Sequence, residues 1–463
     1  MKKVLFLAAA TAAIVSSCSQ SAESVIEDNS NNIETSQTPV NMSVYTASST
    51  RAGNTGNITD AQSLAAKGGF GVFAYQTGGT DYTAGQTTFP PDFMYNQKVT
   101  GTTTNGTTSW TYSPIKYWPN DNDDADNAGA KGLGKTGKVS FFAYAPYADP
   151  SATNANTTAG ITAVSANSAM SDPTVTYKLA TKSSDNVDLL WGTAETNTSA
   201  AKTNGTTVSG SAQNGKTLTD GKAAVNVDLT KMKTNGKIQF NFKHALAKFG
   251  GNGGIKIRAN YDESDGKTKI TVRSITITTA GANDGFTTGG TLNLATGVWS
   301  NTTTSSDVTY TSTISGNNLA DAIKEPDKVE KWADLTNTGV TATAQDVFST
   351  DATDNGFFLI PDAALPSFKV TVDYVVRTED SKLKKGYSET ENKITKTVSF
   401  GEATAALNKR YSLTIILGMT SVKFDATVSN WENTTGSGSS ATTNNTDVNL
   451  PINVTDPTPT TGK

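Results

Sequence analysis

The sequence has little cysteine, histidine or charge. Its 463 residues include one cysteine, Cys18, and one histidine, His244. These counts exclude a disulfide framework and a zinc site of cysteines and histidines, and a Ser-His-Asp triad would have to use His244. Charged residues make up 17 %, whereas an ordinary soluble domain has about a quarter. The formal net charge of −4 offers no basic surface for nucleic acid, so we expect no such partner.

Long hydrophobic runs are also missing. The apolar stretch 4–15 is too short for a stable membrane-spanning helix, and it follows the basic pair Lys2 and Lys3. It leads into Val15-Ser16-Ser17-Cys18, which has the pattern of a lipobox. We therefore expect residues 1–17 to be a signal peptide and Cys18 to carry a lipid. An ordinary signal peptide with Cys18 as a bystander is the alternative.

The mature chain is dominated by short segments in which apolar and polar residues alternate. This period of two, with many Thr, Val, Ile and aromatic residues, is typical of half-buried β-strands. The segments are 40–46, 70–75, 139–144, 238–242, 255–257, 270–277, 370–376, 411–417 and 422–428. Helical patterns are confined to 61–67, 319–324 and 328–335. The pattern predicts an all-β protein built of β-sandwiches.

The same pattern predicts the domain organisation. Residues 18–39 are polar and would form a tether after the lipid. The glycines at 250–254 interrupt the strands, so we place one sandwich at 40–254 and a second at 255–432. Residues 433–463 begin with a Gly, Ser, Thr and Asn linker and would form a flexible tail.

Residues that could carry chemistry are few. His244 lies in an alternating apolar segment and is expected to be a packed, hydrogen-bonded structural residue. Nucleophile elbows, phosphate-binding loops and dinucleotide fingerprints are missing. The acidic run Asp121–Asp126 lacks the turn glycine and the final Glu of a calcium loop, so we expect a solvated loop. The sequence predicts no catalytic residues, no metal and no cofactor.

One aromatic cluster allows two interpretations. Trp110, Tyr112, Tyr117 and Trp118 lie close together in the sequence. Such rings fill a sandwich core or stack on sugars. Tyr117 and Trp118 are the candidate glycan contacts.

The two ends of the mature chain are the most informative. Val40, Met42 and Val44 form one apolar face of a predicted strand. The peptide bond between Arg51 and Ala52 follows this strand and lies in a segment of small residues, which is typical of a site open to proteases. A second strand pattern lies near the other end, and no predicted strand next to it in the sequence could pair with it. Its one apolar face is made of Val448, Leu450, Ile452 and Val454.

These ends suggest an exchange between copies of the chain. Cleavage after Arg51 would free 40–46, and 448–454 of a neighbour could refill the groove by strand addition. A head-to-tail contact that does not close into a ring grows a filament. Pro451 cannot donate a ladder hydrogen bond, and a plain disordered tail remains the alternative.

A set of short motifs spread over nearly the whole mature chain resembles the fimbrillin family. Besides the lipobox and the Ser-Thr-Arg-Ala context of Arg51, they are Gly69-Phe70-Gly71-Val72-Phe73-Ala74-Tyr75, Lys116-Tyr117-Trp118-Pro119, Phe141-Phe142-Ala143-Tyr144-Ala145-Pro146, Asp188-Leu189-Leu190-Trp191, Phe242-Lys243-His244-Ala245-Leu246-Ala247-Lys248, Phe358-Leu359-Ile360-Pro361 and Phe424-Asp425-Ala426-Thr427-Val428-Ser429-Asn430-Trp431. Each is weak alone, but their order and spacing together are specific.

The resemblance implies two tandem transthyretin-like β-sandwiches with Greek-key topology and a role as a non-enzymatic subunit of a type V pilus. It implies an outer-membrane lipoprotein precursor lipidated at Cys18 and cut by an arginine-specific protease at Arg51. The removed strand would be 40–46 and the donated strand 448–454, and the partners would be other copies or related fimbrillins in a head-to-tail polymer that supports adhesion. The alternative is a surface-anchored lipoprotein, or a tip adhesin, that binds glycans without polymerising.

Overall fold

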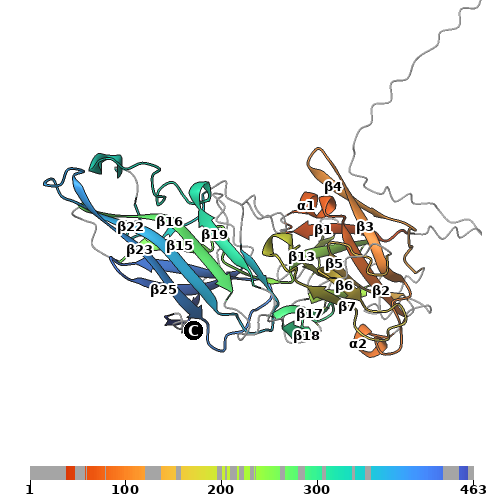
Figure 1. Cartoon of the computed structure of the whole chain (residues 1–463). Coiled ribbons are helices and arrows are strands. Elements are labelled where there is room, and N and C mark those ends of the chain that lie inside the picture. Colours follow the sequence, from red (N-terminus) through yellow and green to blue (C-terminus); the bar gives the residue numbers. More distant parts are fainter. Residues whose placement is uncertain are drawn as a thin grey trace, which may run out of the picture. The chain divides into compact units, whose positions relative to one another are not determined.

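The computed structural model describes residues 38–46, 58, 60–78, 80–119, 137–152, 158–194, 201–203, 206–208, 216–217, 224–229, 234, 236–260, 266–279, 287–304, 309–335, 339–349, 356–430 and 448–456. These residues belong to one compact unit, and they form β-sheets with a few short helical turns (Figure 1). The predicted all-β fold class is confirmed. The transthyretin-like topology and the predicted boundary at 250–254 stay predictions.

The N-terminal sheet contains the first predicted strand. Its path is β1 (Asn41–Thr46), β13 (Lys237–His244), β8 (Leu190–Thr193), β5 (Lys138–Ala145), β2 (Phe70–Gly78), β3 (Met94–Thr104) and β4 (Thr107–Tyr112). β12 (Ala224–Leu229) pairs with β5 and with β11 (Lys216–Thr217), while β9 (Ala201–Thr203) pairs with β10 (Thr206–Val208). The turn of helix α1 (Ala61–Ala66) packs beside β3, β4 and β1. Its N-terminus is capped, since the Ser63 N–H donates to Asp60 Oδ1 over 2.6 Å.

Two sheets face each other in the C-terminal part. The first contains β20 (Gln345–Asp346), β15 (Ile255–Ala259), β24 (Lys409–Leu417), β14 (Ala247–Phe249), β21 (Phe357–Leu359), β25 (Val422–Asn430) and β26 (Val448–Leu450). The second contains β19 (Thr311–Ser315), β16 (Thr268–Thr279), β22 (Phe368–Glu379), β23 (Tyr387–Ser399) and β27 (Asn453–Thr455). Alternate residues of both sheets enter one core, as the period of two predicts.

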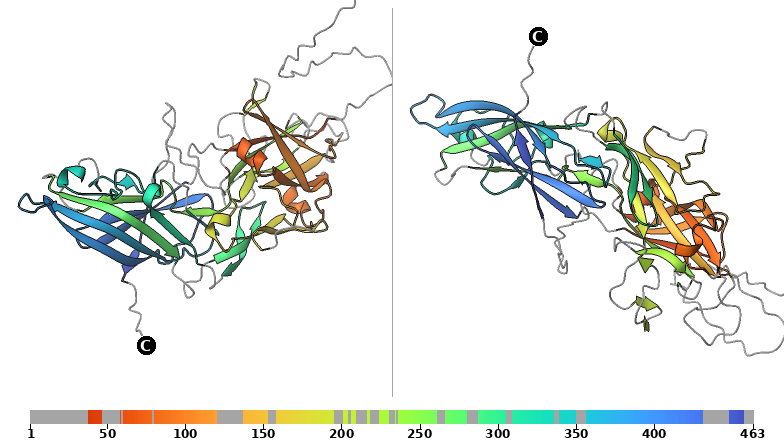
Figure 2. Two further views of the ribbon diagram at one scale, coloured as in Figure 1. Left: turned by 45° about the horizontal axis from the view of Figure 1, so that its top comes forward. Right: turned by 90° about the horizontal axis from the view of Figure 1, so that it is seen from below.

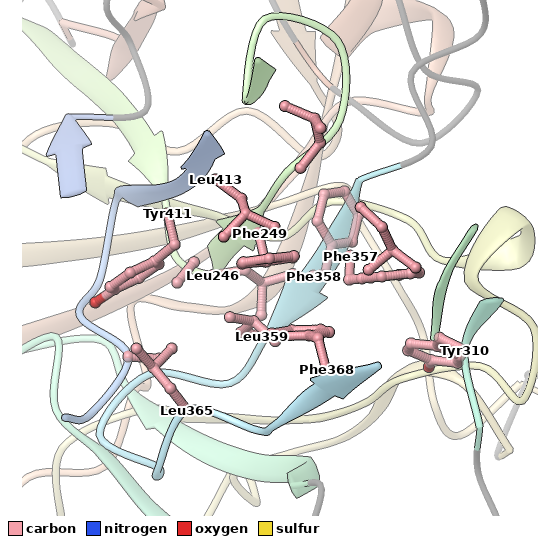
Figure 3. Close-up of a cluster of buried hydrophobic side chains, with 14 of the residues drawn as sticks. Leu246, Phe249, Tyr310, Phe357, Phe358, Leu359, Leu365, Phe368, Tyr411 and Leu413 are labelled. Atoms are coloured by element: carbon pink, nitrogen blue, oxygen red, sulfur yellow. The ribbon is translucent and has the colours of Figure 1, made fainter. Parts of the chain in front are cut away.

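Aromatic stacking fills part of that core (Figure 3). The ring of Phe249 lies 3.8 Å from that of Phe368 with only 10° between their planes, and Phe357 continues the stack. Phe249 comes from β14, Phe357 from β21 and Phe368 from β22, so the stack joins the two sheets. A pair with offset rings, such as Phe357 and Phe368 with centroids 5.9 Å apart, adds about 0.5–1.5 kcal/mol to the burial of the two side chains.

The remaining helical elements are short. They are α2 (Tyr82–Gly85), η1 (Ser183–Asp185), η2 (Gly316–Asn318) and η3 (Trp332–Leu335). The helix expected at 319–324 is absent from this described stretch, and only the last residues of 328–335 form a turn. The apolar side chains at Leu319 and Ile323 are buried instead through a loop that crosses the core.

A four-stranded sheet combines distant parts of the sequence. It runs β18 (Trp299–Thr304), β17 (Thr287–Asn293), β7 (Thr174–Lys178) and β6 (Gly160–Val164), and β17 and β18 lie beside β6 and β7 in Figures 1 and 2. Two tryptophans fix the hairpin, because Trp191 Nε1 donates to the Leu294 carbonyl over 2.8 Å and Trp299 Nε1 to that of Ala245 over 2.9 Å. The hairpin therefore links strands from before and after the glycines at 250–254.

Gly297 tests the importance of this link. Its φ is +71°, and a Cβ added there would lie 2.4 Å from the Trp191 ring. Gly297→Ala is expected to lower the free energy of unfolding by about 3 kcal/mol, because the left-handed backbone costs about 1–2 kcal/mol and the overpacking about 1–3 kcal/mol. Urea denaturation measures this loss.

Gly316→Ala is the matched control for Gly297→Ala. Its φ is +55°, yet an added Cβ would meet no atom within 4 Å. Only the backbone term of about 1–2 kcal/mol is expected. Equal losses for the two variants would contradict the role assigned to the Trp191 contact.

Candidate functional site

The predicted removable strand is an integral part of the N-terminal sheet. β1 pairs in parallel with β13, from Asn41 opposite Lys237 to Thr46 opposite Phe242. The Asn41 N–H also donates to the Gly236 carbonyl over 3.0 Å. β1 therefore reaches its place through a strand about 200 residues further along the chain.

The apolar face of β1 enters the N-terminal core. Val40 is 1 % exposed and Met42 is 7 % exposed, whereas Val44 is half-buried against the same core. Phe240 and Phe242 of β13 belong to this cluster. Full burial of one such side chain contributes about 1.5–3 kcal/mol, so this face supplies much of the free energy that holds β1. Val40, Met42 and Val44 therefore share one face of β1 that packs on the core, and the removal of this strand stays a prediction.

The first residues of this strand are held on a second side. The Val40 N–H donates to the Lys116 carbonyl and the Trp118 N–H to the Thr38 carbonyl, both over 2.9 Å. The Tyr112 hydroxyl donates to the Val40 carbonyl over 2.8 Å. Burial raises the pKa of Tyr112, so this hydroxyl stays protonated at neutral pH.

The later residues of β1 border a hollow. It has a volume of about 250 Å³ and lies between β1, α1 and the β3–β4 hairpin. Its walls include Ser43, Val44, Asp60, Gly106 and Trp110. The second side of β1 is thus occupied by protein at its start and by this hollow further along.

The chain on the far side of the predicted cleavage point is anchored separately. Ile58 is 2 % exposed, and its N–H donates to Asp188 Oδ2 over 3.4 Å. The same carboxylate oxygen lies 2.7 Å from His244 Nδ1, and both side chains are buried. Cys18, Arg51 and Ala52 lie outside the described residues. The described chain on either side of 47–57 is therefore tied to the sheet by different contacts.

The contact between Asp188 and His244 explains two of the sequence motifs. Asp188 precedes β8 and His244 ends β13, and these two strands pair with His244 opposite Leu190. The structural interpretation of His244 is confirmed. A carboxylate partner was not predicted, because it lies 56 residues away in the sequence.

The predicted glycan contacts separate in the structure. Tyr117 is 46 % exposed. Trp118 is 2 % exposed, and its ring lies edge-on to Phe141 at 5.7 Å. The prediction that Trp118 contacts a glycan is wrong, because this side chain fills the core beneath β1. The two residues form no exposed pair of rings.

The predicted donor segment pairs with its own chain. Leu450 and Val448 of β26 lie opposite Ala426 and Val428 of β25, and Val454 of β27 lies opposite Val398 of β23. The segment has no neighbour in the sequence to pair with, but the assembled sheets offer it two edges. It passes from the edge of one C-terminal sheet to the edge of the other.

Pro451 explains why this segment is two short strands and not one. It follows the last residue of β26 and precedes β27, so its missing N–H falls outside both ladders. Leu450 and Ile452 pack half-buried against the core, whereas Val448 is 56 % and Val454 40 % exposed. The four apolar residues therefore do not share one buried face here.

Metal sites and membrane-spanning helices were sought in the part of the chain that the structure describes. There, no cluster of three or more His, Cys, Asp or Glu side chains could hold a metal ion. The acidic run Asp121–Asp126 lies outside the described residues. No described helix is both long enough and apolar enough to cross a membrane.

Comparisons with known proteins find similarity to fimbrial proteins. It is 30 % identical over 219 residues to the fimbrium subunit Fim1C of Phocaeicola vulgatus, a match that covers 47 % of this chain and 43 % of that protein. The match thus spans less than half the length of this curated relative. No protein-family profile matches the chain.

A solved structure agrees over a longer stretch. A fimbrial protein from Bacteroides vulgatus superposes with a TM-score of 0.53 at 20 % identity, covering 85 % of this chain and 99 % of that one. At this identity the likeness shows a shared fold. The chain is therefore similar to a fimbrium subunit over part of its sequence and shares the fold of a fimbrial protein, which supports the resemblance drawn from the motifs.

Met42 offers a direct test of the buried face of β1. Met42→Ala is expected to lower the free energy of unfolding by about 2–5 kcal/mol, since it removes a buried side chain and leaves a cavity. Met170→Ala is the matched control, because Met170 is 55 % exposed and its loss should cost less than about 0.5 kcal/mol. Thermal or urea unfolding distinguishes the two, and similar losses would contradict the assigned burial.

Proposed function

We propose that the protein is a non-enzymatic structural subunit of a type V pilus that supports adhesion at the cell surface. It would be exported with the signal peptide 1–17, lipidated at Cys18 and anchored in the outer membrane as a precursor. Cleavage between Arg51 and Ala52 by an arginine-specific protease would then free β1. The observation that carries the proposal is β1, a strand buried in the N-terminal sheet whose partner strand is distant in the sequence.

Loss of β1 would create an acceptor groove. The apolar side chains of β13, among them Phe240 and Phe242, would lose the cover of Val40 and Met42. The backbone edge of β13 would lose its partner along residues 237–242. A groove with both features accepts an extended chain by strand addition.

The proposed donor is the segment 448–454 of another copy or of a related subunit. Val448, Leu450 and Ile452 have the same spacing as Val40, Met42 and Val44. Burial of three such side chains contributes about 4–9 kcal/mol before ordering costs are subtracted. In their present place only Leu450 and Ile452 pack against the core, so the groove would bury more apolar surface than the segment now buries.

Pro451 weakens the proposed donor at one position. The Asn41 N–H faces β13, so Ser43, two residues later, faces it too. Pro451 takes the place of Ser43 when Val448 replaces Val40, and the place of Asn41 when Leu450 replaces Val40. Both registers omit one ladder hydrogen bond, which contributes about 0.5–1.5 kcal/mol.

Controlled proteolysis of the chain from Ser19 onward tests the proposal. Light trypsin treatment should produce a new N-terminus at Ala52, read by mass spectrometry, and filaments should then grow, followed by light scattering and negative-stain microscopy. Leu450→Ser should abolish growth by removing an apolar donor side chain. Asn449→Ser is the matched control and should leave growth intact, because Asn449 lies on the polar face.

A stable monomer after cleavage at Arg51 would contradict the polymerising subunit. It would favour the alternative of an anchored lipoprotein or tip adhesin, for which the exposed Tyr117 ring is a starting point for a sugar screen. Growth that persists after deletion of 447–463 would contradict the proposed donor and leave the acceptor groove in place.

A further inference from the structure

The two ends of β1 are held unequally. Thr38 and Val40 contact the segment 116–118 on one side, and Asn41 contacts Gly236 on the other. The isolated bridge between Pro39 and Tyr117 lies in the same place. At Ser43 and Val44 the structure shows the ladder to β13 on one side and a hollow on the other.

Burial follows the same direction. The exposed fraction rises from 1 % at Val40 to 7 % at Met42, and Val44 is half-buried. The ladder to β13 continues to Thr46, but the hydrogen bonds on the second side end at Val40, and apolar burial falls from Val40 to Val44, in the direction of Thr46. This weaker end is the one that leads to the predicted cleavage point.

Tyr112 makes a side-chain contact with the strand backbone. Its hydroxyl donates to the Val40 carbonyl over 2.8 Å and lies 3.3 Å from the Lys116 N–H, which donates to it. When the strand leaves, the hydroxyl would lose the Val40 carbonyl, its shortest hydrogen bond. This loss is costly because Tyr112 is only 7 % exposed. At the same moment the Lys116 carbonyl would lose the hydrogen bond from the Val40 N–H, and the Trp118 N–H its bond to the Thr38 carbonyl.

We propose that the strand seated in this groove is positioned at its first residues by Tyr112 together with the backbone of Lys116 and Trp118, and that release starts at the opposite end, at Thr46. This rests on the proposed function and deepens it. Tyr112 acts as a positioning residue that fixes which backbone carbonyl occupies the site of Val40. The replacing strand must offer an N–H and a carbonyl at that site, and Val448 and Leu450 both do.

Strand release from the cleaved monomer tests the position. A fluorophore on the N-terminus of the chain from Ser19 onward marks the fragment, and fluorescence polarisation after dilution follows its dissociation. Tyr112→Phe should increase the release rate about threefold to tenfold, because it removes one hydrogen bond between the body and the fragment. Unfolding of the body freed of its fragment should change less than release does, because only the 3.3 Å contacts of the hydroxyl with Lys116 remain there. A merely structural role of the hydroxyl would change unfolding at least as much as release.

Tyr95→Phe is the matched control. Tyr95 lies in the same sheet, and its hydroxyl donates to the Ser165 carbonyl over 3.1 Å, away from β1. Its release rate should equal that of the unaltered chain. Equal rates for Tyr112→Phe and Tyr95→Phe would overturn the positioning role.

Residue-resolved hydrogen exchange on the uncleaved chain tests the direction. The amides of Asn41, Ser43 and Tyr45 face β13, and exchange should quicken in that order. Uniform or reversed protection would overturn release from Thr46. Both measurements use monomers and do not require filaments to form. If the release and exchange rates are as predicted but no filaments grow, only the proposed pilus function is contradicted. Filaments with unaltered Tyr112→Phe release would contradict only this inference.

Discussion

The burial of one short strand determines how this protein can behave. β1 covers the N-terminal core with Val40 and Met42. Its ladder partner β13 is distant in the sequence: the Ser43 hydroxyl, for example, donates to the carbonyl of Ile238, which lies 195 residues further along the chain. The core therefore needs a strand at this place, and under the proposed function that strand need not be covalently continuous with the rest of the sheet. Hydrophobic burial and ladder bonds are the same whether the strand arrives from its own chain or from another.

The C-terminal segment has the complementary property. It occupies two sheet edges with two short strands, an ion pair between Lys396 and Asp456, and two half-buried apolar side chains. Exposed ion pairs contribute little to stability. The segment is therefore held in this position mainly by its two short ladders, its two half-buried side chains and the high effective concentration that its tether to the same chain gives it. Pro451 fits here because the chain turns from one sheet to the other at that residue.

The sequence predicted the features that depend on local pattern. Alternation of Val40, Met42 and Val44 was sufficient to identify a strand and its buried face, since neighbours in a strand point to opposite sides. The partner β13 was not predictable, because pairing across so long a separation is set by the assembled sheet. The same holds for the edges that bind 448–455 and for the carboxylate beside His244. Trp118 shows the limit of prediction from sequence for aromatic residues, because the same residue types fill a core and line a binding surface.

A reversible lock on β1 tests the central claim most directly. Ser43 and Gln239 are partners in the parallel ladder and both are half-buried, and the chain from Ser19 onward has no native cysteine. In the double variant Ser43→Cys and Gln239→Cys, a disulfide would hold β1 in place after cleavage at Arg51. The account predicts no filaments under oxidising conditions and growth once a reductant is added, with both single variants growing throughout. Filaments that form while the disulfide is intact would contradict it.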